Sequence, residues 1–165
     1  ARGGRAVLPQ EAYRPHPEHL LPARPLVLWH YTDMSDPRWT WGARYLQLRQ
    51  DPAATSPQKI GARNSRGWAA YLLGGQVLIK RYPFVAGAAY PDFGCNTELF
   101  TNADMLELET LGPLQTLPPG GGRVEYTEHW FLFHAEPGTG EDDLDRDLAP
   151  LVTETDRLLN ALPAR

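Results

Sequence analysis

The chain has 165 residues, which is enough for one domain with a hydrophobic core and too few for two large ones. Its hydrophobic share of 42% is ordinary, and no apolar run approaches the roughly 20 residues of a membrane span, so composition excludes a wholly disordered chain and a membrane helix. The net charge of -4 falls on residues 141–165, which hold seven acids and three arginines. No basic patch or Lys/Arg-rich amphipathic stretch predicts nucleic acid or a membrane surface as partner.

The cysteine content and residues 1–24 bear on the cellular compartment of the protein. Cys95 is the one cysteine of the sequence, which excludes an internal disulfide and a cysteine-based zinc site. We expect it to be a buried, inert thiol, the usual state of a free cysteine. Residues 1–24 lack the apolar core of a signal peptide. Both observations favour a cytoplasmic protein.

The first third of the chain is rich in turns. Prolines make residues 1–24 an extended arm, since they forbid a regular helix. The apolar run 25–31 predicts a buried strand, and 32–42 a turn-rich loop with two tryptophans. Residues 44–50 alternate like a half-exposed strand, and 51–67 are expected to be mostly loop.

Two hairpins are expected next. Within 68–84, two β-rich runs flank Gly74-Gly75, a two-residue turn of the kind that hairpins prefer. Residues 96–109 form a second hairpin that turns near 102–104.

The last third contains the expected final strand and a helix. Loops are expected over 85–94 and 111–122, followed by a long last strand over 123–134. Pro150 suits the first turn of a helix whose apolar residues have helical spacing. These residues are Leu148, Leu151, Val152, Thr155 and Leu159. Many short strands with frequent turns predict an all-β fold, an antiparallel β-sandwich with a short C-terminal helix. The expected domains are an arm (1–24), a β-sandwich (25–136) and an acidic linker with a helix (137–165).

The second predicted hairpin carries three glutamates on one face. Side chains alternate along a strand, so Glu107 and Glu109 share a face on one strand. A turn at 102–103 pairs Glu98 with Glu107, and a turn at 103–104 pairs Glu98 with Glu109. Both registers oppose like charges, which is destabilising without compensation.

Two interpretations of these acids stay open. One is a solvated sheet face with Lys80 or Arg81 between the carboxylates. The other is a carboxylate site, because close acids push their pKa values apart and one can act as a base while another holds a proton. Sugar hydroxyls are natural partners for such a face.

A resemblance to a known family adds to the second interpretation. It rests on Leu108-Glu109-Thr110, the turn 117–120 and the aromatic strand 126–133, with the signatures at 68–75 and 90–98. These segments resemble the later strands of galactose mutarotase-like proteins, the aldose 1-epimerase superfamily, and look closest to an uncharacterised branch of it. That family is a large β-sandwich about twice this length, so the resemblance implies part of a mutarotase-like supersandwich, the later half of a longer protein or a reduced version.

The resemblance also implies a chemistry. In the family, the glutamate of Leu-Glu-Thr takes the proton of the anomeric hydroxyl while a histidine protonates the ring oxygen. It follows that Glu109 is the base. The family's Asn-x-x-Asn-His pattern is absent here, and His30 is the candidate acid by its relative place. Glu98 and Glu107 are expected to bind sugar hydroxyls or to adjust the pKa of Glu109.

Aromatic and basic residues complete the predicted sugar site. Trp39 and Trp41 lie two residues apart in a predicted loop and share a face, so we expect them to stack on a sugar. Arg38 binds a sugar hydroxyl or forms an ion pair. The prediction is a protein that binds a small-molecule carbohydrate, with anomer interconversion as its possible reaction. The alternative is a non-catalytic sugar-binding or structural β-sandwich.

Metal-dependent functions are weaker alternatives. His30, Asp33 and Asp36 could ligate a metal, but their spacing fits no helix or strand motif. His129 and His134 resemble the end of a cupin strand, but no His-x-His cluster precedes them. No metal and no cofactor are therefore predicted, and the sequence leaves the oligomeric state open.

Overall fold

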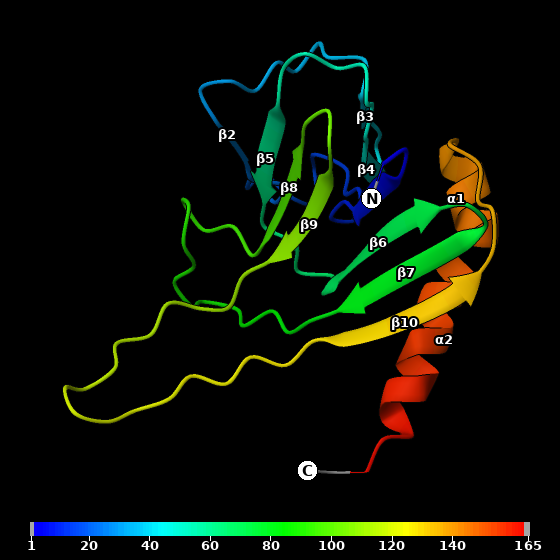
Figure 1. Cartoon of the computed structure of the whole chain (residues 1–165). Coiled ribbons are helices and arrows are strands. Elements are labelled where there is room, and N and C mark those ends of the chain that lie inside the picture. The colour runs from blue at the N-terminus through cyan, green and yellow to red at the C-terminus, as the bar shows by residue number, and fades with distance from the viewer. Residues whose placement is uncertain (1, 164–165) are drawn as a thin grey trace.

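A computed structural model describes residues 2–163, which form two antiparallel sheets followed by a helical C-terminal segment (Figure 1). The strands are β1 (Arg5–Pro9), β2 (Leu26–Leu28), β3 (Trp39–Trp41), β4 (Tyr45–Arg49), β5 (Gln58–Ala62), β6 (Trp68–Leu73), β7 (Gln76–Arg81), β8 (Thr97–Thr101), β9 (Leu106–Thr110) and β10 (His129–His134). The helices are α1 (Glu141–Asp147) and α2 (Ala149–Asn160). One sheet has the order β10-β7-β6-β1-β4-β3 and the other β2-β5-β8-β9. The predicted β-sandwich with a C-terminal helix is confirmed.

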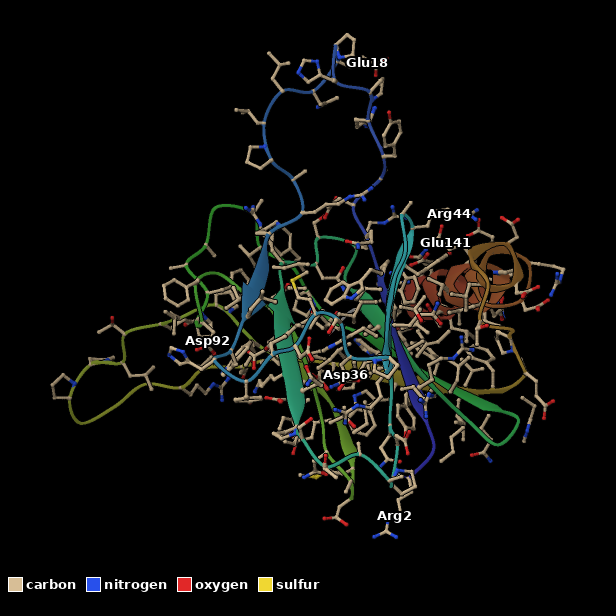
Figure 2. All side chains as sticks on the ribbon, turned by 90° about the horizontal axis from the view of Figure 1, so that it is seen from above. Arg2, Glu18, Asp36, Arg44, Asp92 and Glu141 are labelled. Carbon is tan, nitrogen blue, oxygen red and sulfur yellow. The ribbon has the colours of Figure 1, made fainter. Side chains whose placement is uncertain are left out.

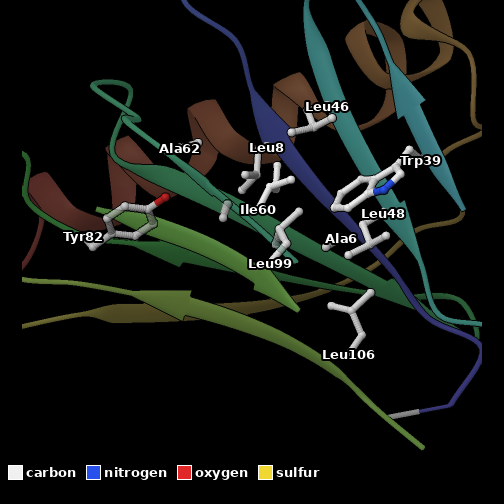
Figure 3. Packing of buried hydrophobic residues seen from close by; sticks show 11 residues of the cluster. Ala6, Leu8, Trp39, Leu46, Leu48, Ile60, Ala62, Tyr82, Leu99 and Leu106 are labelled. Atoms are coloured by element: carbon white, nitrogen blue, oxygen red, sulfur yellow. The ribbon is translucent and has the colours of Figure 1, made fainter. Parts of the chain in front are cut away.

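The hydrophobic core lies between the two sheets. Leu8 and Leu46 point into it from the six-stranded sheet, and Ile60 and Leu99 from the four-stranded sheet (Figure 3). In this packing β9 contacts β1, and β8 contacts β4. Because side chains alternate along a strand, burying Leu99 inward turns Glu98 to the opposite, outer face of the four-stranded sheet.

The helices cover the outer face of the six-stranded sheet. Leu144 of α1 and Leu148 are fully buried against side chains that include Val7 and Trp68. Arg44 anchors α1 through ion pairs with Glu141, Asp142 and Asp145. The acidic C-terminal segment is thus packed on the sandwich. Among the described residues, no helix has the length and apolar character to cross a membrane.

Several predicted elements are confirmed. Strands β6 and β7 form the hairpin that turns at Gly74-Gly75, whose φ values of 56° and 75° favour glycine. Strands β8 and β9 form the second hairpin. Helix α2 has Pro150 in its first turn.

Three strands, β1, β3 and β5, lie where none was predicted. Residues 1–24 were expected to be an extended arm, but β1 within them is buried and pairs with both β4 and β6. Because prolines cluster after this strand, the whole segment was predicted to be irregular and the strand was not recognised. Strand β5 lies within 51–67, a segment expected to be mostly loop, and pairs with β2 and β8.

Other boundaries and burial patterns also differ from the prediction. Trp39 and Trp41 were placed in a loop, but they belong to β3, which pairs with β4. Strand β4 is buried on both faces instead of half-exposed, because the core lies on one face and the helical side on the other. Strand β2 is a short edge strand with exposed ends. The predicted long last strand begins only at His129, since residues 123–128 pair with no strand.

Candidate functional site

The site is built on the register of the second hairpin. Glu98 of β8 lies directly opposite Glu109 of β9, and Phe100 lies opposite Glu107. This is the register with the turn at 103–104, one of the two that the sequence allowed. Two carboxylates therefore face each other across paired strands, an arrangement that needs a cation or a proton.

The cation comes from β5. Lys59 Nζ lies 2.7 Å from Glu98 Oε2 and 3.2 Å from Glu109 Oε1. Lys80 and Arg81, the cations considered from the sequence, lie elsewhere. Lys80 Nζ donates to the Leu108 carbonyl and pairs with Glu128, and Arg81 pairs with Asp156 on α2.

We call the charged outer surface of the four-stranded sheet the carboxylate face. Its residues are Lys59, Asp92, Glu98, Glu107 and Glu109.

Burial separates the members of the carboxylate face. Glu98 is only 2% exposed, whereas the side chain of Glu109 is 34% exposed. Burial raises the pKa of Glu98, and the neighbouring Asp92 carboxyl raises it further, while Lys59 lowers it. Burial also raises the pKa of Glu107, together with the adjacent Glu109. Glu109 is therefore a partly accessible carboxylate beside two glutamates whose pKa values are raised.

Lys59 keeps its charge in this setting. Burial by itself lowers the pKa of Lys59, but the hydrogen bonds to Glu98 and Glu109 outweigh it, so the pKa is raised. The ammonium also lies 4.9 Å from the centre of the Trp29 ring, a cation–π distance. Lys59 thus neutralises one carboxylate and fixes the positions of two.

The loop after β2 brings aromatic side chains to the carboxylate face. Thr32 Oγ1 accepts a hydrogen bond from the Trp29 N–H and donates to the Lys59 carbonyl, which ties the loop to β5. Burial raises the pKa of Tyr31, and the charges of Glu109, Glu98 and Glu107 contribute to the rise. The Tyr31 hydroxyl therefore lies within electrostatic reach of all three glutamates.

A second loop closes over the buried end of the face. Asp92 and Phe93 have φ values of 47° and 59°, a left-handed conformation that non-glycine residues adopt rarely. A hollow of about 330 Å³ lies between this loop and the end of β2 (the labelled Asp92 is at the left in Figure 2). It is lined by Val27, Leu28, Trp29, His30, Asp92 and Phe93.

Gly61 permits this close packing. It lies opposite Glu98, and a Cβ at this position would come within 2.3 Å of Cys95 Sγ. Cys95 is buried as expected, and burial raises its pKa to about 12, which keeps the thiol protonated. The cysteine therefore acts as a packing group between β5 and the 91–95 loop.

Not all predicted site residues meet at this face. Glu98, Glu107 and Glu109 lie together, and His30 is exposed in the hollow beside Asp92; within residues 2–163 no hydrogen bond or ion pair joins it to Glu109.

The tryptophan pair and Arg38 lie in another part of the sandwich. The rings of Trp39 and Trp41 are 5.1 Å apart, but Trp39 is buried in the core, where its Nε1 donates to Gln58. Arg38 is buried in an ion pair of 2.8 Å with Asp36. None of the three has a described contact with the carboxylate face.

Sequence reasoning missed Lys59, Trp29, Tyr31 and Asp92. The alternation in the short segment 58–62 was a signal for Lys59, because it places the lysine on the same face as Glu98 once the strand is recognised. Within residues 2–163, no group of three or more His, Cys, Asp or Glu side chains is arranged to hold a metal ion.

No family model matches the chain, and neither the curated proteins nor the solved structures yielded a match. The resemblance to galactose mutarotase-like proteins therefore stays a prediction from the sequence.

Proposed function

We propose that the protein binds carbohydrates at the carboxylate face, with Glu109 as the central acceptor for sugar hydroxyls. The observation that carries the proposal is the partial exposure of Glu109 beside an ion pair between the half-buried Lys59 and the buried Glu98. A carboxylate held by a fixed lysine is oriented before the ligand arrives, which reduces the entropic cost of binding. The aromatic rings of Trp29 and Tyr31 beside it supply apolar surface for a sugar ring.

The same arrangement supports anomer interconversion as the reaction. Glu109 takes the proton of the anomeric hydroxyl, the C1–O1 bond becomes a carbonyl, and the bond from C1 to the ring oxygen breaks as that oxygen accepts a proton. Rotation about the C1–C2 bond and closure of the ring by the reverse steps give the other anomer. The donor of the second proton is His30, as the resemblance implies, or Glu107, whose raised pKa suits a proton carrier.

The alternative is a non-catalytic sugar-binding module. One observation favours it: within residues 2–163 no hydrogen bond or ion pair joins His30 to Glu109, and Glu109 does not line the hollow that holds His30. Binding and catalysis make different demands, because binding needs the carboxylate face alone while exchange needs a proton donor at the ring oxygen.

One NMR experiment separates these functions. A panel of aldoses is mixed with the protein, and the exchange between anomers and the broadening of ligand lines are followed together. Exchange that disappears in Glu109→Gln and persists in Glu125→Gln, an exposed acid of the 111–128 loop, supports the reaction. Broadening without exchange supports the binding module, and neither effect with folded protein overturns the proposal.

A further inference from the structure

Within residues 2–163 each sheet ends in two edge strands, and three of these edges are protected against pairing with another chain. Strands β2 and β3 have only three residues each, and β9 carries Glu107 and Glu109. Short length and charged side chains are devices by which proteins block an open edge. Strand β10 has neither. It is six residues long, contains no Asp, Glu, Lys, Arg or Pro, and pairs with β7 without a bulge.

The open edge of β10 presents the backbone groups of its even-numbered residues. Along a strand, the N–H and C=O groups of successive residues point alternately to the two sides. The N–H of Ala135 donates to the Gly75 carbonyl, so the odd-numbered residues of β10 bond to β7. The backbone groups of Trp130, Leu132 and His134 therefore point away from the sheet, and within residues 2–163 no strand pairs with them.

Large apolar side chains lie beside this open edge. Trp130 and Leu132 are 65% and 64% exposed. Alternation places them on the face opposite Phe133, which packs on the helical side. Among the described residues, no side chain of β10 belongs to the core between the two sheets, so the stripe of Trp130 and Leu132 is uncovered. An uncharged edge strand that exposes large apolar side chains marks a site of pairing with another chain.

Two copies of β10 can pair with each other across a two-fold axis. Paired residues of antiparallel strands point to the same face, so even-numbered residues must lie opposite even-numbered ones. An axis at Phe131 places Trp130 of each copy opposite Leu132 of the second copy, and these residues exchange the free backbone hydrogen bonds. An axis at Leu132 places Trp130 opposite His134 instead.

Charge favours the axis at Phe131. Glu128, one residue before β10, lies on the same face as Trp130, whose Nε1 donates to its carboxylate at 2.8 Å. In this register Glu128 of each copy faces His134 of the second copy, a side chain that becomes cationic on protonation. In the other register Glu128 faces Glu136. Opposite charges across paired strands are stabilising, whereas like charges are destabilising.

We propose that the protein forms a symmetric dimer through β10, with the two-fold axis at Phe131. The two six-stranded sheets join into one continuous sheet, and Trp130 and Leu132 of both copies form a shared apolar stripe. The helices lie on the other face of this sheet, away from the stripe (Figure 1). The partner is a second copy because the edge is complementary to itself both in apolar side chains and in charge. This inference does not rest on sugar binding at the carboxylate face.

Analytical ultracentrifugation from micromolar to millimolar protein tests the proposal. We expect a reversible equilibrium between monomer and dimer. Leu132→Lys places a charge on each open edge and should raise the dissociation constant by about tenfold or more. Leu114→Lys, the same change at a leucine of the 111–128 loop that is 61% exposed, should leave the dissociation constant unchanged. His134→Glu, which faces Glu128, should weaken the dimer severalfold, whereas His134→Lys should preserve it.

The other outcomes would overturn the proposal. A protein that stays monomeric up to millimolar concentration has no such dimer. A dimer that is weakened equally by Leu132→Lys and Leu114→Lys, or by neither, does not form through β10. Equal effects of His134→Glu and His134→Lys exclude the axis at Phe131. Circular dichroism of each variant shows that it is folded, and the two His134 variants test the edge independently of Leu132→Lys.

Discussion

The two outer faces of the sandwich differ in what covers them. The outer face of the six-stranded sheet is apolar and packs against α1 and α2 through Leu144 and Leu148. The outer face of the four-stranded sheet carries Glu107 and Glu109, and no helix within residues 2–163 lies on it (Figure 1). In Figure 2, Arg44 and Glu141 mark the helical side and Asp92 the other.

The comparison shows that charged residues on a sheet face can either stabilise the fold or remain without balancing partners. On the helical side, Arg44 pairs with three acids and fastens α1 to the sheet, so charge serves the fold. On the carboxylate face, acids outnumber cations and a buried oxygen of Glu98 lacks a donor. Such an arrangement does not maximise stability, and this is expected of a surface that binds a ligand.

The largest effect is expected on the helical side. Leu144→Ala removes a fully buried side chain between α1 and the sheet and should lower the free energy of unfolding by about 3 kcal/mol. Urea denaturation measures the loss, and Leu162→Ala, at an exposed position, is the control. Folded Leu144→Ala should bind sugars like the unaltered protein; a matching loss of affinity would mean that the two faces are not independent.

A smaller loss is expected when the central cation is removed. Lys59→Met leaves Glu98 buried without its partner and should cost about 2 kcal/mol of unfolding free energy at pH 7. The double variant with Glu98→Gln should recover part of this loss, because the buried charge is then gone. Equal stabilities of the single and double variants would show that the ion pair is not what holds Glu98.

The pH dependence of stability sharpens the account of Glu98. Its pKa is raised in the folded state above the ordinary value of 4.5, chiefly by burial, so the folded protein keeps this proton longer than the unfolded chain. The stability that protonation contributes is present below the ordinary pKa and is lost as pH rises through the raised value.

Unfolding free energies measured between pH 4 and pH 7 test this direction. As pH rises, the unaltered protein should lose stability relative to Glu98→Gln. Between the ordinary and the raised pKa of Glu98, the slope of the unfolding free energy should approach about 1.4 kcal/mol per pH unit. Parallel curves for the two proteins would contradict the raised pKa.

The smallest effect on stability is expected at the exposed rim of the carboxylate face. Glu107→Gln relieves repulsion with Glu109 and should change the unfolding free energy by less than about 0.5 kcal/mol. Its effect on sugar affinity or anomer exchange should exceed its effect on stability. A variant that is stabilised and binds as before would exclude Glu107 from the site.

Parts of the fold could be predicted because local signals were strong. The Gly74-Gly75 turn between two β-rich runs and the spacing around Pro150 each specify an element without tertiary information. Strand β1 could not be recognised, because five residues before a proline-rich stretch take their structure from pairing with β4 and β6.

The candidate site, like the fold, was predictable only where local sequence signals specify it. Alternation and turn length placed Glu98 opposite an acid, since the register follows from the hairpin itself. Lys59 comes from a segment far away in sequence, and Asp92 from the irregular loop just before β8, and only the packing of β5 and the 91–95 loop brings them to Glu98. For Trp39 the prediction failed. Its residue type suggested stacking on a sugar, but its side chain is buried in the hydrophobic core.

The most direct test of the carboxylate face as the ligand-binding surface is a backbone amide NMR titration with D-glucose. We predict that the shifted amides belong to the loop after β2, the 91–95 loop and strands β5, β8 and β9, centred on Lys59 and Glu109. The chemical shifts of the amides of α1 and α2 should not change. Shifts confined to the helical side or to Trp39 and Trp41, or no shifts at millimolar ligand, would contradict the account.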